Sequence, residues 1–233
     1  MTRAGMSRRD AESQEFMDAP DCDLDRLERT YRQFRVVNRL VSGWRRIYRR
    51  WLRPRLDHDR PTTLLDIGFG GGDISRALTT WAARDGLALR TTAIDPDERA
   101  LRHVRRLPDG GVRFEQASSA DLVARGERYD WVISNHLLHH LDAAALDALL
   151  ADSVALSRDL VVHNDLSRGR AGYGFYAVAT LPFARRSFIH QDGLLSIRRS
   201  YRRTELQAIV PPGWQVRSMV PQRLLLTHEG ARR

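Results

Sequence analysis

The sequence of 233 residues contains no lysine, so all 38 of its basic residues are arginine. The absence of lysine excludes a Walker-type phosphate-binding loop, which requires a lysine directly after its glycines. The net charge of +9 would suit a nucleic acid or an anionic membrane surface. However, arginine and alanine are abundant along the whole chain, which indicates a general compositional bias. We therefore do not predict nucleic-acid binding.

Cysteine and long apolar runs are also scarce. The single cysteine, Cys22, excludes a disulfide framework and a cysteine-based zinc site. No apolar run approaches the ~18 residues of a membrane-spanning helix, and the arginine-bearing N-terminus lacks the apolar core of a signal peptide. We expect a cytoplasmic protein, whose length fits one α/β domain with some additions.

A glycine-rich loop at residues 68–72 is the most informative stretch. The short apolar run at residues 63–67 has the pattern of a strand buried in a parallel sheet, and a helical pattern follows from Asp73. A dinucleotide-binding fingerprint that begins at Gly68 would need glycine at position 73. Asp66 lies two residues before the first glycine, where a carboxylate suits a cationic ligand group better than a phosphate.

Strand and helix patterns alternate along the chain up to residue 165. Further strands are predicted at 89–94, 112–116, 129–134 and 160–163, with two more at 214–219 and 223–227. This order predicts an α/β fold with a doubly wound, seven-stranded, mostly parallel sheet, whose last two strands form an antiparallel hairpin at the edge. Ligands of such sheets bind at the carboxyl ends of the strands. Polar residues lie at these ends: Asp66, Asp95, Ser118, Asn135 and His163.

Three segments flank or interrupt this alternation, and we expect residues 57–233 to form the α/β domain. Residues 1–20 are polar and aperiodic, which predicts a disordered lead. Residues 21–56 carry an amphipathic helical pattern with several aromatic residues and a predicted break near Arg35. Residues 166–203 form an insertion after the fifth strand and are rich in aromatic residues.

Two motifs resemble a known family. The stretch at residues 66–72, Asp-x-Gly-x-Gly-x-Gly, resembles the first motif of class I S-adenosylmethionine (SAM) methyltransferases. Residues 138–141, Leu-His-His-Leu, are similar to a stretch of the quinone-biosynthesis and related small-molecule methyltransferases. The resemblance covers about residues 60–165. It implies a Rossmann-like methyltransferase with SAM as its cofactor.

The resemblance also implies roles for the residues at the strand ends. Asp66, Gly68 and Gly70 would hold the amino-acid end of SAM. Asp95 would bind the ribose hydroxyls, and Pro96 would lie beside it against the cofactor. The remaining candidates lie after the third and fourth strands: Ser118, Ser119 and Asn135. Many relatives carry an aspartate near position 118 for the adenine amino group, so backbone groups could replace that contact here. Asn135 would orient the cofactor through its backbone carbonyl.

Two histidines are the candidate catalytic residues. Methyl transfer from a sulfonium is an in-line displacement that in some reactions also requires removal of a proton. Histidine exchanges protons near neutral pH, so we interpret His139 and His163 as pocket residues, one of them a candidate base. A resemblance to the cyclopropane fatty-acid synthase branch, in which residues aligned with these two line the methyl-transfer chamber, implies a similar placement. The alternative is that both are structural histidines. If residues 137–141 form a helical turn, His139 and His140 cannot both face the pocket.

The resemblance implies that the flanking segments shape the substrate pocket. For residues 21–56, three interpretations stay open: a lid, a packed flank helix with a basic face, and a helix at a membrane interface. The aromatic insertion favours a small, apolar or aromatic acceptor. We predict methylation at a phenolic or carboxylic oxygen, or at a quinone-type ring carbon, in natural-product metabolism.

The residues after the fourth strand argue against a metal-dependent methyltransferase. Asn135 and His136 stand there in place of the acidic ligands of metal-dependent catechol enzymes, so we predict no metal site. The alternative function is a non-catalytic SAM-fold protein that binds RNA or a protein partner through its arginine-rich surface. The oligomeric state stays open.

Overall fold

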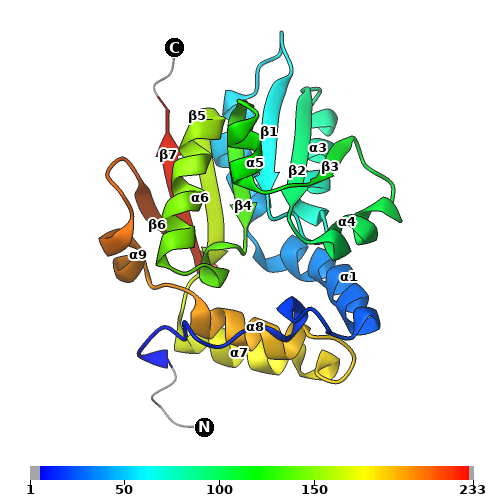
Figure 1. The fold of residues 1–233 in the computed structure, drawn as a ribbon, viewed down its shortest axis with the longest axis vertical. Coiled ribbons are helices and arrows are strands. Elements are labelled where there is room, and N and C mark those ends of the chain that lie inside the picture. Colours follow the sequence, from blue (N-terminus) through cyan, green and yellow to red (C-terminus); the bar gives the residue numbers. More distant parts are fainter. Residues whose placement is uncertain (1–5, 231–233) are drawn as a thin grey trace.

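The protein, described here by a computed structural model of residues 6–230, is built on one seven-stranded sheet (Figure 1). The strand order is β3-β2-β1-β4-β5-β7-β6. The strands are β1 (Thr62–Ile67), β2 (Leu89–Asp95), β3 (Val112–Gln116), β4 (Tyr129–Asn135), β5 (Ser157–Leu166), β6 (Gln215–Met219) and β7 (Arg223–Glu229). Strand β7 is antiparallel to its neighbours β5 and β6, and the other pairs are parallel. The predicted doubly wound, mostly parallel sheet is therefore confirmed.

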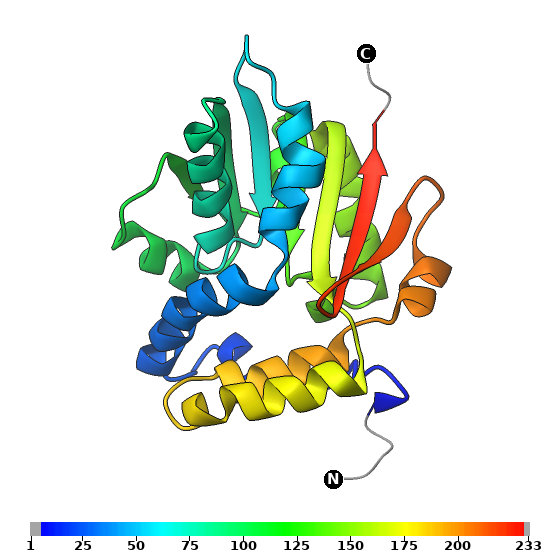
Figure 2. The same ribbon diagram turned by 180° about the vertical axis from the view of Figure 1, so that it is seen from behind.

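Helices cover both faces of this sheet (Figures 1 and 2). The α-helices are α1 (Leu24–Val41), α2 (Trp44–Ile47), α3 (Asp73–Arg84), α4 (Glu98–Arg105), α5 (Ser119–Ala124), α6 (Ala143–Leu156), α7 (Arg170–Thr180), α8 (Ile189–Arg199) and α9 (Arg203–Ile209). Short helical turns are η2 (Phe16–Asp18), η3 (Tyr48–Leu52), η4 (Arg53–Arg55), η5 (Leu138–His140) and η6 (Leu181–Phe183). The apolar side chains of α5, α6 and α9 form one core layer, and those of α2, η3 and α3 form another on the opposite face.

Strand β1 is buried on both of its faces. Leu64 belongs to the core layer under α2 and α3, whereas Leu65 belongs to the layer under α5 and α6, and neither side chain is exposed to solvent. A central strand of a parallel sheet needs apolar residues on both faces, because helices pack against each of them. This burial holds Asp66, near the end of β1, at a defined position along the carboxyl edge of the sheet.

A second layer of helices lies across the carboxyl ends of the parallel strands. Helices α7 and α8, formed by the predicted insertion at residues 166–203, make a helical hairpin there, and α1 runs beside them (Figure 2). Because strand ends and helices face each other at this edge, any ligand held there contacts segments that are distant in the sequence. No helix within residues 6–230 combines the length and the apolar character that crossing a membrane would require.

The segment 21–56, for which a lid was one interpretation, divides into two parts. Helix α1 lies at the carboxyl edge, whereas α2 and η3 pack against a face of the sheet, where Trp44 and Leu52 are buried. The division falls at Gly43 and not near Arg35, where a break was predicted. Gly43 has φ +76°, a left-handed conformation that glycine adopts without strain and that ends α1.

The prediction of a disordered lead at residues 1–20 needs a correction. Residues 1–5 lie outside the described residues, but residues 6–20 pack along α8. The carboxylate of Asp192 accepts hydrogen bonds from the backbone N–H groups of Phe16 and Met17, each 2.9 Å long. Glu15 is only 3% exposed. The prediction failed because this segment is held by hydrogen bonds to a distant helix and not by an apolar pattern of its own.

Candidate active site

A cavity of about 400 Å³ lies along the carboxyl edge of the sheet, between the strand ends and helices α1, α7 and α8. Most of the residues predicted to hold the cofactor line it: Asp66, Gly68, Gly70, Asp95, Pro96 and Asn135. Titratable residues from the N-terminal segment, η5 and α8 also line it: Glu15, Asp18, His139, His140 and Asp192. The cavity therefore joins two groups of polar side chains, which we call the loop end and the histidine end.

Asp66 dominates the electrostatics of the loop end. Its side chain is 2% exposed, and the Ser75 hydroxyl donates to Oδ2, but within residues 6–230 the buried Oδ1 has no hydrogen-bond partner. Burial raises the pKa of Asp66 to about 7, and the negative charges of Asp73 and Asp95 add to this shift. A buried carboxylate with an unsatisfied oxygen is stabilised by a cationic ligand group. These residues therefore fit the ammonium group of SAM.

Asp95 organises the glycine loop. Its Oδ2 accepts a hydrogen bond of 2.9 Å from the Gly70 N–H, and its Oδ1 accepts one of 2.9 Å from the Asp97 N–H. Gly70 has φ +51°, so a side chain at this position would strain the turn that brings the loop to the carboxylate. Each carboxylate oxygen can accept more than one hydrogen bond, so Asp95 can still bind ribose hydroxyls.

Ser118 and Ser119 do not line this cavity, in contrast to our expectation that they contact adenine. The Ser118 hydroxyl hydrogen-bonds to Asp121 in a capping box that starts α5, and the Ser119 hydroxyl donates to Asp152 at 2.6 Å. Both hydroxyls therefore form hydrogen bonds within the protein. Serine is a preferred residue at helix N-caps, which explains its presence at this strand end.

Asn135 lines the cavity, but its side chain serves the fold. Its Oδ1 accepts hydrogen bonds from Trp44 Nε1 at 2.9 Å and from Asn164 Nδ2 at 3.2 Å. These contacts connect the end of β4 with α2 and β5. A contact to the cofactor through the backbone carbonyl of Asn135 is compatible with this arrangement and stays a prediction.

His163 is fully buried but does not line the cavity, which corrects its predicted position. Its Nδ1 hydrogen-bonds with the Ser134 hydroxyl at 2.7 Å, and its ring stacks on Trp214 with the centroids 5.6 Å apart. Burial lowers its pKa to about 3, although Asp165 opposes this shift. Because its ring stacks on Trp214, a residue of the hydrophobic core, His163 faces the core and not the cavity. It is a structural histidine in this fold.

His139 and His140 both line the cavity, contrary to the expectation that one would turn away. Residues 138–140 form a 3₁₀ turn, and the two imidazole rings lie 4.3 Å apart between centroids. Arg199 holds this turn, because its guanidinium donates to the backbone carbonyls of His139 at 3.2 Å and of His140 at 3.1 Å. The turn therefore presents neighbouring residues to one side.

His139 lies between two buried carboxylates. Asp165 Oδ1 is 2.7 Å from His139 Nδ1, and Glu15 Oε1 is 3.4 Å from His139 Nε2. Burial alone would lower the pKa of His139, but Asp165 and Glu15 outweigh it and raise the pKa to about 9. Conversely, His139 holds the pKa of Asp165 well below its usual range against the effect of burial. A protonated His139 cannot accept a further proton, so the arrangement does not support its predicted role as a base.

Two residues of the site were not predicted as its main residues: Glu15 was missed, and Asp192 received little weight. Glu15 lies in the segment predicted to be disordered, and no local pattern distinguishes it. Asp192 lies in the insertion, where the sequence indicated only a weaker candidate for substrate contact. Its carboxylate anchors the turn that carries Glu15, and burial raises its pKa to about 6. Asp165 had one usable signal, because it lies close to the end of the fifth strand.

Comparison with known proteins agrees with this geometry. Residues 64–159 match a family model described as a methyltransferase domain. The plantazolicin methyltransferase BpumL with SAH aligns over 93% of this chain and 93% of its own, with 14% identity and a TM-score of 0.64. Human N-acetylserotonin methyltransferase with SAM aligns over 90% and 57%, with 10% identity and a TM-score of 0.62. A search of the curated proteins finds no sequence that matches this chain.

The sheet order, the glycine loop and the strand-end carboxylates define the class I methyltransferase fold. Together with the methyltransferase-domain match over residues 64–159, these features support a SAM-dependent methyltransferase with SAM as its cofactor. When bound, SAM supplies an electrophilic methyl group. The residues that line the loop end would bind it, orient it and keep water from it.

Replacing Asp95 by alanine is expected to weaken SAM binding roughly 10- to 100-fold. A hydrogen bond to a charged group contributes about 1.5–3 kcal/mol, and about 1.4 kcal/mol corresponds to a tenfold change in affinity. Isothermal titration calorimetry on the purified protein measures this effect. The matched control is Ser118→Ala, at the neighbouring strand end, which should bind SAM as the unmodified chain does. Equal affinities for Asp95→Ala and the unmodified chain would contradict the ribose assignment.

SAM binding is expected to weaken as the pH falls below about 7. The pKa of Asp66 is raised to about 7, and its protonated carboxyl cannot pair with the ligand's ammonium. Each unit of pH below this pKa should therefore raise the Kd toward tenfold. Titrations across this range provide the measurement. Asp66→Asn should bind weakly at every pH and lose this dependence. If the Kd of the unmodified chain for SAM does not change with pH, the assignment of Asp66 to the ammonium group is contradicted.

Proposed function

We propose that this enzyme transfers the methyl group of SAM to a small apolar or aromatic acceptor that binds at the histidine end of the cavity. The acceptor atom would be a phenolic or carboxylic oxygen, or a ring carbon of quinone type, in natural-product metabolism. The observation that carries the proposal is the continuity of one cavity from Asp66 and Asp95 to Tyr176 and His140. Donor and acceptor can thus meet inside it.

The walls between the two ends support an apolar acceptor. Their apolar side chains come from α1, the glycine loop, the residue directly before η5 and the end of β5: Tyr31, Phe34, Val37, Val41, Phe69, Leu137 and Leu166. Small-molecule sites of this size are lined mainly by apolar and aromatic groups, with a few polar groups that set orientation. The polar groups of the histidine end would orient the acceptor atom toward the methyl group, since in-line transfer needs close approach.

The segments that lie over the carboxyl edge of the sheet support a small acceptor over a polymer. Helices α7 and α8 and the N-terminal segment cover the carboxyl edge (Figure 2). Among proteins of the same fold, BpumL binds a monoazolic desmethylPZN analog together with SAH, at a TM-score of 0.57. Human N-acetylserotonin methyltransferase is named for a small aromatic acceptor. These neighbours agree with our proposal for the acceptor class.

Turnover on a panel of acceptors tests the proposal. The purified enzyme should form S-adenosylhomocysteine with simple phenols, aromatic carboxylic acids or hydroquinones, and mass spectrometry should find one added methyl group on the acceptor. Polar nucleosides and short hydrophilic peptides serve as comparison acceptors, because the apolar walls offer them few partners. Asp95→Ala controls for background hydrolysis of SAM. Turnover on the polar acceptors alone would overturn the proposed acceptor class.

Gly193→Ala is expected to raise the KM for the acceptor roughly tenfold with little change in SAM affinity. A Cβ at Gly193 would clash with the Tyr176 hydroxyl, so the Tyr176 ring would have to move within the histidine end. Overpacking of this kind costs about 1–3 kcal/mol. The matched control is Gly174→Ala in α7, where an added Cβ meets nothing within 4 Å. An unchanged KM in Gly193→Ala would place the acceptor elsewhere.

A further inference from the structure

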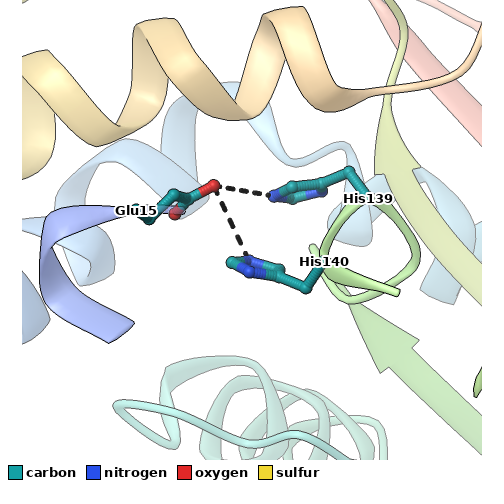
Figure 3. A group of neighbouring side chains, drawn as sticks. All are labelled: Glu15, His139 and His140. Atoms are coloured by element: carbon teal, nitrogen blue, oxygen red, sulfur yellow. Dashed lines mark ion pairs between the residues drawn. The ribbon is translucent and has the colours of Figure 1, made fainter. Parts of the chain in front are cut away.

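Three side chains from two distant segments converge at the histidine end. Figure 3 shows Glu15, from the N-terminal segment, directed toward His139 and His140 of the η5 turn. Glu15 Oε1 lies 3.4 Å from His139 Nε2 and 3.9 Å from His140 Nε2, and all three candidate ligand atoms lie within 4.8 Å of one another. Glu15 and His139 are nearly inaccessible to solvent, at 3% and 1% exposure.

Both imidazoles are oriented by a carboxylate on the side away from Glu15. His139 Nδ1 is 2.7 Å from Asp165 Oδ1, and His140 Nδ1 is 3.1 Å from Asp18 Oδ2. A proton on each Nδ1 satisfies these contacts. An ion that displaced the second proton of His139 would then meet a lone pair on each Nε2. Histidines that bind metal ions typically donate their other ring N–H to a carboxylate in this way.

The distances within the cluster are long for hydrogen bonds. N–H···O bonds in proteins span about 2.7–3.2 Å, and within residues 6–230 the buried His139 Nε2 has no hydrogen-bond partner. Two ligands that each lie about 2.1 Å from one ion are roughly 3.0–3.4 Å apart, depending on the angle at the ion. The separation of Glu15 Oε1 from His139 Nε2, 3.4 Å, lies at the upper end of this range, and its separation from His140 Nε2, 3.9 Å, would have to shorten by about 0.5 Å on binding.

We propose that Glu15, His139 and His140 bind one divalent transition-metal ion, with Zn²⁺ as the best match. Two imidazoles and one carboxylate are an established donor set for catalytic zinc, and they leave a coordination position for another ligand. Here that position would face the cavity, which all three residues line. The carboxylates of Asp18 and Asp165 add negative charge next to the imidazoles, which favours a cation.

The surrounding contacts also hold the candidate ligands in place. Glu15 Oε1 accepts a hydrogen bond of 2.7 Å from the Ser196 hydroxyl, which fixes the carboxylate. Arg199 brings a positive charge near the site, but its guanidinium is engaged by the carbonyls of the η5 turn and of Ser13. It fixes the backbone of both ligand segments. The site is therefore supported by side chains that do not themselves bind the ion.

At the histidine end, the ion would bind and activate the acceptor. A hydroxyl or carboxylate oxygen bound at the open position would be held in the cavity, and a metal ion lowers the pKa of a bound hydroxyl. This role rests on the proposed function, whereas metal binding itself does not. An oxygen-bearing acceptor is the class that such a site would select.

Metal binding by the full chain, without a purification tag, tests the proposal. After treatment with a chelator, the protein is dialysed against Zn²⁺ and the bound metal is measured by elemental analysis. Titration with Co²⁺ reports the ligand field through its visible spectrum. We expect one ion per chain and at least a tenfold loss of affinity in Glu15→Gln and in His140→Ala. Asp18→Asn should reduce the affinity about 10- to 100-fold through the orientation of His140.

The matched control is His190→Ala, because His190 hydrogen-bonds with Thr180 outside the cluster. It should bind Zn²⁺ and Co²⁺ as the unmodified chain does. SAM calorimetry on each variant verifies the fold and separates this proposal from the assignment of the cofactor site. Less than one ion per chain at saturating Zn²⁺, or equal affinity in Glu15→Gln, would overturn the metal site while leaving SAM binding intact.

Discussion

A carboxylate removed from water needs a cation or several donors as partners, and this constraint shapes both ends of the cavity. At the loop end, Asp66 keeps one buried oxygen without a partner within residues 6–230, so a cationic ligand completes it. At the histidine end, Glu15 and Asp165 share His139. The two ends therefore attract positive charge in different ways: one suits the donor molecule, and the other holds a proton or an ion.

The parallel sheet brings these charges to one edge, and the helical layer keeps water away from them. Helices α7 and α8 contribute Tyr176 and Asp192 to the cavity, and Asp192 in turn anchors the turn that carries Glu15. Arg199 joins the N-terminal segment to the η5 turn. Removal of bulk water strengthens each electrostatic interaction within the site. The covering layer therefore affects the chemistry as well as access.

Much of the fold and the loop end could be predicted, because the sequence patterns that indicate them each lie within a short stretch of chain. The strand before Asp66, the glycine positions and the acid at Asp95 are each readable within a few residues. The errors have a common cause. Ser118 and His163 stand at strand ends as the pattern requires, but contacts with Asp121 and Trp214 direct their side chains into the fold. A strand-end position predicts the edge of the sheet, and local packing decides which way the side chain points.

The order of strands and helices, the doubly wound sheet and the strand-end carboxylates of the loop end all follow from the sequence alone. Hydrophobic periodicity and glycine conformation act over short stretches of chain, so they can be read without coordinates. Only the tertiary structure decided the histidine end. The 3₁₀ turn that directs both His139 and His140 to one side, and the approach of Glu15, depend on hydrogen bonds to Asp192 and Arg199. Contacts between residues 60 and 176 positions apart, as these are, leave no periodic trace in a single sequence.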